Sequence, residues 1–277
     1  MKVLITGAKG QLGQDLQKVF ADEEVAAYDL DLDITDLSPL LKKFESFKPD
    51  TIIHAAAYTD VDGCEKNQDT AFEVNALGTA NVAIAANYVD AQMLYVSTDY
   101  IFDGESDKPR TEFDNVNPQS VYGKSKLAGE KAVSSLTNKF YIARTAWLYG
   151  HGGANFVKTI LRAAKEKGKL KVVDDQRGSP TFSLDLAEKI KEIVKSGQYG
   201  TYHVTNSGEC SWFDFAKKIV ELGGINAQIT PCSTKEYPRP AKRPAFSVLR
   251  NYNLELRGFK PMRSWQDALE SYFEGSQ

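Results

Sequence analysis

A chain of 277 residues is long enough for one large core, or for a main domain with a smaller lobe. Its formal net charge is −3 with both signs interspersed, so it has no general attraction to nucleic acid or to an anionic membrane surface. The three cysteines show no metal-ligand spacing, and no apolar run has the length of a signal peptide or a membrane span. We therefore expect a cytoplasmic protein with no nucleic-acid or membrane partner.

The first half of the chain alternates short β-branched runs with segments of helical period. Strands are predicted at residues 3–6, 25–29, 51–56, 93–98 and 139–144. Helices are predicted after the first strand and at residues 38–47, 69–88 and 118–135. This alternation requires crossover connections, which predicts an α/β fold with a Rossmann-type, doubly wound parallel sheet.

After about residue 150 the alternation breaks, and six of the ten prolines lie between Pro180 and Pro261. Helices are expected at residues 155–167, 183–196, 211–222 and 265–273, with a short strand at 201–204. We expect a smaller C-terminal α/β lobe that closes over the carboxyl edge of the sheet, where open α/β sheets bind ligands. The dinucleotide-binding domain is assigned to residues 1–147 and 182–204, and the substrate-binding lobe to 148–181 and 205–277.

Three glycines stand between the first strand and its helix, in the spacing G-x-x-G-x-x-G. Gly7 allows a sharp turn, Gly10 lets the backbone approach a pyrophosphate, and Gly13 lets the helix pack closely on the strand. Gln11 and Leu12 open that helix, whose free N–H groups attract phosphate. The spacing differs by one residue from the usual dinucleotide fingerprint, and its place between strand and helix predicts a dinucleotide site.

Acidic residues follow the second strand, where a dinucleotide fold binds the adenosine. We assign Asp29 to the ribose and Asp33 with Ile34 to the adenine edge, and we interpret Asp31 as a solvated loop residue. A carboxylate at Asp29 repels a 2′-phosphate, which makes NADH possible, whereas Lys9 is the nearby cation that favours NADPH.

Tyr122 and Lys126 lie four residues apart, on one face of a helix that we expect to start at Asn117-Pro118. An ammonium group beside a phenol is expected to lower the phenol pKa, so the pair supplies a general acid for carbonyl reduction. Lys126 can also hold the cofactor ribose. A surface Tyr–Lys pair is the alternative interpretation, and the position after the fourth strand favours the catalytic one.

The fourth strand ends in hydroxyl side chains. Thr98 is the candidate for a hydrogen bond to the substrate carbonyl, and Ser97 is the weaker one. Strand-end capping is the alternative for both. His54 ends the third strand, and we interpret it as a structural imidazole rather than a metal ligand.

Several segments together resemble the extended short-chain dehydrogenase/reductases and, within them, the dTDP-4-dehydrorhamnose reductase family. They are the glycine turn 7–13, His54-Ala55-Ala56-Ala57, Ser97-Thr98-Asp99-Tyr100, Tyr122-Gly123-Lys124-Ser125-Lys126 and Arg144-Thr145-Ala146-Trp147. Residues 58–62, 127–130, 175–181 and 243–247 extend the resemblance nearly from end to end.

The resemblance implies hydride transfer from NADPH, with NADH possible, to C4 of dTDP-4-dehydro-6-deoxy-L-mannose, the last step of dTDP-L-rhamnose synthesis. It implies that Tyr122 protonates the alkoxide while Thr98 polarises the carbonyl. The small side chains of Ala55, Ala56 and Ala57 would then line the cofactor channel.

The resemblance also implies a sugar site made by Trp147, Asp99 and Tyr100. Asn155 would lie near the sugar nucleotide. Arg239 and Arg243, with Lys242 beside them, are suited to pairing with a diphosphate, and a solvated basic loop is the alternative interpretation.

Related sugar-nucleotide dehydratases carry a second carboxylate after the strand-end Thr-Asp, where this chain has Tyr100. The resemblance therefore favours simple ketone reduction over water elimination. Two alternatives stay open: another nucleotide-sugar 4-ketoreductase, and a non-catalytic regulatory subunit that keeps only dinucleotide binding. The second would be expected to lack part of the set Thr98, Tyr122 and Lys126, which this chain retains.

Some members of the resembled family dimerise around Mg²⁺ held by carboxylates. Asp15 matches the first of these positions, but the second falls at Leu184, with Asp185 adjacent, and leucine cannot bind a hard cation. We expect no metal and a monomer, with a weak or metal-independent dimer possible.

Overall fold

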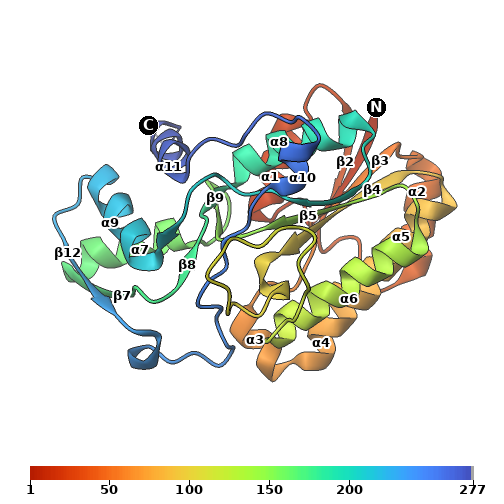
Figure 1. The fold of residues 1–277 in the computed structure, drawn as a ribbon. Coiled ribbons are helices and arrows are strands. Elements are labelled where there is room, and N and C mark those ends of the chain that lie inside the picture. The colour runs from red at the N-terminus through yellow and green to blue at the C-terminus, as the bar shows by residue number, and fades with distance from the viewer. Residues whose placement is uncertain (276–277) are drawn as a thin grey trace.

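The computed structural model describes residues 1–275 and shows a six-stranded parallel sheet with a smaller lobe beside it (Figure 1). Within these residues, no helix combines the length and the hydrophobicity that crossing a membrane requires. The strands of the sheet are, in order, β10 (Gly200–His203), β5 (Phe140–Thr145), β4 (Gln92–Thr98), β3 (Thr51–His54), β1 (Lys2–Thr6) and β2 (Glu24–Tyr28). The chain runs from β1 to β2 on one side and then crosses back over β1 to β3 on the other side. The carboxyl ends of β1 and β3 therefore border the crevice where such sheets bind ligands.

Helices cover both faces of this sheet, because alternate residues of each strand point to opposite sides. Val3 and Ile5 of β1 pack with helices α1 (Gln11–Val19) and α8 (Ser183–Ser196). Leu4, between them in the sequence, packs on the other side with α2 (Leu37–Phe47), α5 (Thr79–Tyr88) and α6 (Val121–Leu136). The Rossmann-type doubly wound sheet predicted from the sequence is confirmed.

Two of the predicted helices differ clearly from the structure. The expected helix over 69–88 contains a π-helical turn, η1 (Glu73–Gly78), between α4 (Gln68–Phe72) and α5, and it is preceded by α3 (Val61–Lys66). The predicted start of α6 at Asn117-Pro118 is wrong, because the Ser120 hydroxyl accepts a hydrogen bond from the Gly123 N–H (3.1 Å) and caps the helix there.

The smaller lobe is built from helices α7 (Phe156–Lys167), α9 (Trp212–Leu222) and α11 (Trp265–Glu274), around a core rich in aromatic rings. Three two-stranded sheets join them, none of which was predicted. They pair β7 (Lys169–Val173) with β12 (Gln228–Cys232), β6 (Leu148–Tyr149) with β9 (Thr181–Phe182), and β8 (Arg177–Gly178) with β11 (Cys210–Ser211). Single 3₁₀ turns, η2 (Asp99–Ile101) and η3 (Thr234–Glu236), complete the regular structure with α10 (Tyr252–Leu256).

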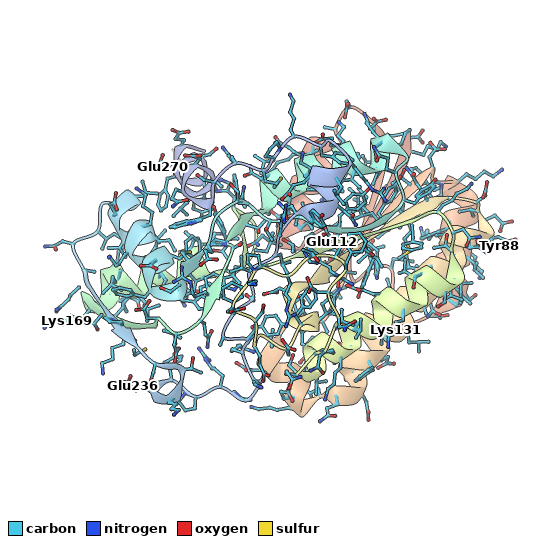
Figure 2. All side chains as sticks on the ribbon, viewed as in Figure 1. Tyr88, Glu112, Lys131, Lys169, Glu236 and Glu270 are labelled. Carbon is cyan, nitrogen blue, oxygen red and sulfur yellow. The ribbon has the colours of Figure 1, made fainter. Side chains whose placement is uncertain are left out.

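The chain returns to the large sheet after residue 182, where α8 packs on α1 and β10 pairs with β5. A second return was not expected. Leu254 of α10 and Met262 pack in the core of the large sheet, although both lie in the stretch 205–277 that we assigned to the lobe. Figure 2 shows Lys169 and Glu236 at the outer end of the lobe, whereas Glu112 lies near the middle of the molecule.

Candidate active site

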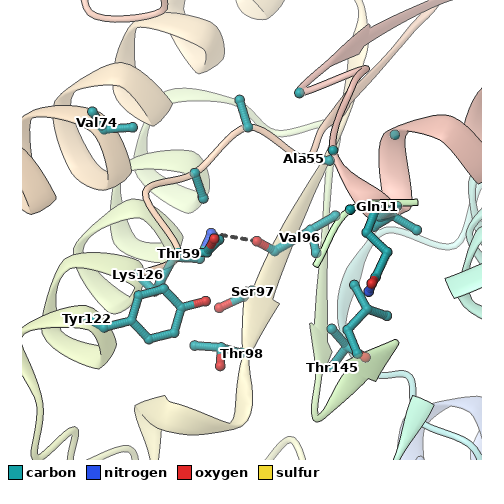
Figure 3. Close-up of a pocket in the computed structure, with 18 of the residues that line it drawn as sticks. Gln11, Ala55, Thr59, Val74, Val96, Ser97, Thr98, Tyr122, Lys126 and Thr145 are labelled. Atoms are coloured by element: carbon teal, nitrogen blue, oxygen red, sulfur yellow. Dashed lines mark hydrogen bonds between the residues drawn. The ribbon is translucent and has the colours of Figure 1, made fainter. Parts of the chain in front are cut away.

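A cavity of about 850 Å³ opens at the carboxyl ends of β1, β3 and β4 (Figure 3). Every residue that the sequence assigned to the cofactor lines it: Gly7, Gly10, Gln11, Leu12, Gly13, Asp29, Asp33, Ile34, Ala55, Ala56, Ala57, Tyr122 and Lys126. A single cavity thus joins the glycine turn to the Tyr–Lys pair.

The glycine turn is packed too closely for any side chain. Gly7 has φ of +72°, and a Cβ on it would lie 2.7 Å from the Ala56 nitrogen. A Cβ on Gly13 would overlap the Gly7 carbonyl oxygen. Helix α1 starts after Gly10 with no side-chain cap and no acidic residue in its first turn, so its N–H groups are left for an anionic ligand.

The adenosine end of the cavity is formed by the loop after β2. Asp29 is half-buried at the end of that strand, and the Asp33 carboxylate accepts hydrogen bonds from the Thr35 N–H (2.8 Å) and hydroxyl (2.7 Å). Leu30 lines the same end and is 93% exposed, which makes it an apolar surface available to a flat ring. No motif in the sequence pointed to Leu30.

Tyr122 and Lys126 of α6 face the end of β4, where Ser97 and Thr98 lie (Figure 3). The Lys126 ammonium donates to the Val96 carbonyl oxygen (2.7 Å) and lies 4.1 Å from the centre of the Tyr95 ring. The Thr98 hydroxyl donates to Asp99 Oδ1 (3.0 Å) and accepts from the Tyr100 N–H (3.2 Å). Thr98 therefore caps η2 as well as facing the cavity, so the two interpretations of this residue are compatible.

The electrostatics of the pair differ from our expectation. Burial, reinforced by the nearby Asp99 charge, raises the pKa of Tyr122 above its usual value, while Thr98 opposes the change. The expectation that Lys126 would lower the phenol pKa is wrong, because Lys126 is itself buried and its own pKa falls to about 7. A phenol in this setting keeps its proton until a developing alkoxide takes it.

Asp99 and Tyr100 follow Thr98 at the edge of the cavity. Burial raises the pKa of Asp99 to about 6, against the hydroxyls of Ser247 and Thr98, which lower it. The Tyr100 ring meets the Tyr122 ring edge-on, with 5.6 Å between the ring centres. Asp99 and Tyr100 therefore line the first cavity together with Tyr122.

A second cavity of about 760 Å³ lies in the lobe and shares Tyr100 with the first. Its walls carry both apolar rings and cations, among them Phe156, Trp212, Arg162, Lys167, Lys169, Lys171, Arg239 and Arg243. Trp147 lines the first cavity and stacks on Trp212, which lines the second, with 3.4 Å between the ring centres. The stacked pair therefore stands where the two cavities adjoin.

The two arginines expected at a diphosphate lie in this second cavity, held by one carboxylate of α3. Asp62 Oδ2 lies 3.0 Å from the Arg243 guanidinium and 3.8 Å from that of Arg239, and Oδ1 accepts from the Ala241 N–H (3.1 Å). The Arg243 guanidinium also lies 5.9 Å from the centre of the Tyr100 ring. This segment is therefore anchored to the sheet domain and is not a freely solvated basic loop.

Asn155 does not line either cavity. It caps α7 by accepting from the Lys158 N–H (3.1 Å), and its amide donates to Gln11 Oε1 (2.9 Å) and the Gly150 carbonyl (2.7 Å). An asparagine directly before a helical run is the pattern of a helix cap, which accounts for its position. Asn155 therefore reaches the site only through Gln11.

The carboxylates considered for a metal have other partners. Asp15 is buried and bonded to Ser183 and Lys18, and Asp185 pairs with Arg263 and accepts from Asn206. Among residues 1–275, no group of three or more His, Cys, Asp or Glu side chains is arranged to hold a metal ion. His54 lies between the hydroxyls of Thr6 (2.6 Å) and Thr79 (3.0 Å), which fits a structural imidazole.

Comparison with known proteins identifies the family. The chain matches the RmlD substrate binding domain family over residues 1–277. It belongs to that family.

Three relatives show the extent of the likeness. A solved dTDP-4-dehydrorhamnose reductase from Clostridium acetobutylicum is 51% identical, with a TM-score of 0.98 and complete coverage of both chains. The same enzyme from Bacillus anthracis, solved in complex with NADP, is 45% identical, with a TM-score of 0.97 and 99% of each chain covered. The spore coat polysaccharide biosynthesis protein SpsK of Bacillus subtilis is 41% identical over 99% of this chain and 97% of its own.

Several residues of this family member's site were missed by sequence reasoning. Thr35, Thr59, Val61, Val74, Thr145 and Gly153 line the first cavity, and the cations of α7 and β7 line the second. Thr145 ends β5 beside Thr98 in the sheet register, so the rule that strand ends meet at one edge was the available signal for it. No sequence signal was available for the cations of α7 and β7.

Proposed function

We propose that this protein reduces the C4 ketone of dTDP-4-dehydro-6-deoxy-L-mannose to dTDP-L-rhamnose, with NADPH as the preferred hydride source and NADH also accepted. The observation that carries the proposal is the single cavity in which Thr98, Tyr122 and Lys126 face the glycine turn. A second cavity with aromatic and cationic walls adjoins it at Tyr100, as a sugar attached to a nucleoside diphosphate requires.

The residues of the sheet domain fit a nicotinamide dinucleotide, which supplies the hydride when bound. The uncapped N-terminus of α1 is available for the pyrophosphate, and the turn at Gly7 and Gly13 has no room for side chains. Asp29 is available for the adenosine ribose. Backbone hydrogen bonds at Asp29 and Asp31 lower the pKa of Asp31, and the charges of Lys9 and Lys43 lower it further, so both cations lie near this loop, where a cation favours a 2′-phosphate.

The chemical step requires a proton at O4 when hydride reaches C4. Tyr122 donates that proton from its hydroxyl, and the Thr98 hydroxyl, once it turns from Asp99 toward O4, donates a hydrogen bond that stabilises the developing charge. Lys126 holds the cofactor ribose. Trp147, Asp99 and Tyr100 enclose the sugar, and Arg239 with Arg243 pairs with the diphosphate once Asp62 shares them.

We also propose the domain bounds, the cellular compartment and the oligomeric state of the protein. Residues 1–147 and 182–204 form the dinucleotide-binding domain, and 148–181 with 205–277 form most of the substrate-binding lobe. We expect a cytoplasmic monomer. The free, buried thiols of Cys64, Cys210 and Cys232 support a reducing compartment.

One assay tests the function. Purified protein is supplied with enzymatically made dTDP-4-dehydro-6-deoxy-L-mannose, and the consumption of NADPH and NADH is followed in separate reactions. We expect turnover with both, faster with NADPH, and dTDP-L-rhamnose as the product by NMR. Turnover only with a different 4-keto nucleotide sugar would favour the other 4-ketoreductase, whereas NADPH binding without turnover of any such sugar would favour the regulatory subunit.

A further inference from the structure

A buried ion pair joins helix α6, which carries Tyr122 and Lys126, to strand β5 of the sheet, and neither of its members lines the first cavity. Glu130 of α6 accepts two hydrogen bonds from Arg144 of β5, at 3.0 Å from Nε and 2.8 Å from Nη2. Less than a tenth of either side chain is exposed. Removing two charges from water is costly, so such a pair persists only where its geometry is fully satisfied or where it serves a purpose.

The remaining donors of Arg144 are also held in place. His203 of β10 has Nδ1 at 3.0 Å from the Arg110 carbonyl oxygen and 3.1 Å from that of Arg250, so Nδ1 carries the proton. Its Nε2 is then free to accept from Arg144 Nη1 (3.5 Å). Burial lowers the pKa of His203 to about 3, which keeps the ring neutral for this role.

The pair connects to the site through Lys126. Glu130 lies one turn after Lys126 on α6, so both side chains leave the same face of the helix. Arg144 is the cross-strand neighbour of Ser97, next to the Val96 carbonyl to which Lys126 donates. Burial lowers the pKa of Lys126 to about 7, and the charge of Glu130 opposes that shift.

We propose that Glu130, fixed by Arg144, is a positioning residue that keeps Lys126 charged and directed at the end of β4. The inference rests on the proposed role of Lys126 in holding the cofactor ribose beside Tyr122. It assigns a purpose to a buried ion pair that contacts neither ligand.

The titratable groups around the Tyr122–Lys126 pair leave Glu130 as the main source of negative charge acting on Lys126. His54 of β3 and Tyr95 of β4 lie near Lys126, whereas Asp99 and Tyr100 of η2 and Cys64 of α3 act on Tyr122. Burial lowers the pKa of His54 to about 3 and raises that of Cys64 to about 11, and it also raises those of the three tyrosines, so all five are neutral near pH 7. Asp99 is the remaining carboxyl group, and its charge acts on Tyr122.

The test is Glu130→Gln in the full chain. We expect the alkaline limb of the kcat/KM profile to move to lower pH by about one unit, because an opposite charge nearby is lost. The ¹³Cε resonance of Lys126, assigned with Lys126→Arg, should titrate at correspondingly lower pH in the NADPH complex and in the free protein. The NMR measurement does not depend on turnover, so it still tests the effect of Glu130 on Lys126 if the proposed substrate is wrong.

A second variant separates charge from folding. Glu130→Met combined with Arg144→Met removes both charges and leaves neither one unpaired, so it should fold at least as well as Glu130→Gln. We expect it to keep the shifted Lys126 titration. An unshifted Lys126 titration in this folded double variant would overturn the proposal, because the pair would then serve the packing alone. The exposed pair Arg250–Glu255, replaced in the same way, is the control that should leave Lys126 unchanged.

Discussion

The two halves of the site bind by different means. The sheet half, at the carboxyl ends of β1 to β4, is made of backbone and of the smallest side chains, with Gly7, Gly13 and the alanines 55–57 at its centre. The lobe half is made of long side chains, in particular the stacked Trp147 and Trp212 and a set of cations. The first surface is fixed by the fold, whereas the second changes whenever a side chain changes.

This difference predicts which half of the site determines substrate specificity. A dinucleotide bound by N–H groups and a glycine turn can be held by any chain that folds in this way, so the sheet half defines the reaction. The walls of the second cavity come from segments far apart in the sequence, so, on the proposed function, we expect the lobe half to select the substrate. Substitutions in the two halves should therefore affect different measured quantities.

The largest effect is expected for Tyr122→Phe. Loss of the phenol hydroxyl removes the proton donor, and kcat should fall by roughly 10²–10⁴-fold, while NADPH affinity stays the same. Stopped-flow consumption of NADPH and fluorescence titration measure the two quantities. Tyr88→Phe, at the exposed end of α5 and outside both cavities, is the matched control that should keep full activity. A Tyr122→Phe enzyme that retains more than a tenth of the rate would show that another group donates the proton.

The next prediction compares the stability of alanine variants at two glycines, one in each half. In Gly13→Ala the new methyl group meets backbone atoms of Gly7 and Ala8, which cannot move without distorting the turn, so the free energy of unfolding should fall by about 3 kcal/mol. In Gly178→Ala its nearest neighbours are atoms of the Trp147 ring, which must shift together with the Trp212 ring stacked on it. We expect that variant to fold and to bind NADPH normally but to bind the sugar nucleotide more weakly. Urea unfolding and the two titrations check both, and equal losses of stability would remove the distinction between the halves.

The sequence predicted the sheet half well, for a physical reason. Most of its functional segments lie at the end of a strand or directly after it, so the strand that the sequence pattern reveals also positions them. Examples are Thr98 at the end of β4 and Asp29 directly after β2. The direction of the Tyr122 pKa shift could not be predicted, because it depends on burial that only the packed structure defines.

The lobe half was predicted only in part. Its helices have a clear period, but β6, β8, β9 and β11 are two residues long and exist only because another segment pairs with them. Arg243 was proposed because arginine suits a diphosphate, and it stays a proposal; the residue that anchors it, Asp62, is far away in the sequence and carries no signal of its own. The role of Asn155 at the sugar nucleotide also stays a prediction, because its observed role as a helix cap looks the same in sequence as a ligand contact.

A smaller effect tests the lobe half directly. Arg243→Met removes a guanidinium that we expect to pair with the diphosphate, worth about 2 kcal/mol, so KM for the sugar nucleotide should rise roughly 30-fold. The affinity for NADPH should not change. Arg250→Met, which breaks an exposed ion pair with Glu255, is the control and should leave both quantities unchanged. A fall in kcat with no change in KM would place Arg243 outside the diphosphate site.

The last effect concerns acid stability, which should differ between the halves. The sheet domain holds His54 and His203 fully buried, each with its pKa lowered to about 3, mainly by burial. Protons therefore bind the unfolded chain first, near its ordinary histidine pKa of about 6.5. The stability that these rings contribute is complete above about pH 6.5 and is lost as the pH falls toward 3, at roughly 1.4 kcal/mol per pH unit for each ring.

His203→Gln isolates one of these rings. Asp99 acts in the opposite sense, because its raised pKa of about 6 costs stability as the pH rises from about 4 to 6. The informative quantity is therefore the difference between wild type and variant, measured by urea unfolding at several values between pH 7 and 4.5. We expect the variant to lose less stability on acidification, and hydrogen exchange to rise first in β3 and β10. The lobe should follow later, because its single histidine among residues 205–275 and 148–181 is the half-buried His151. Parallel pH curves for the two proteins would show that His203 takes up its proton without unfolding the sheet domain.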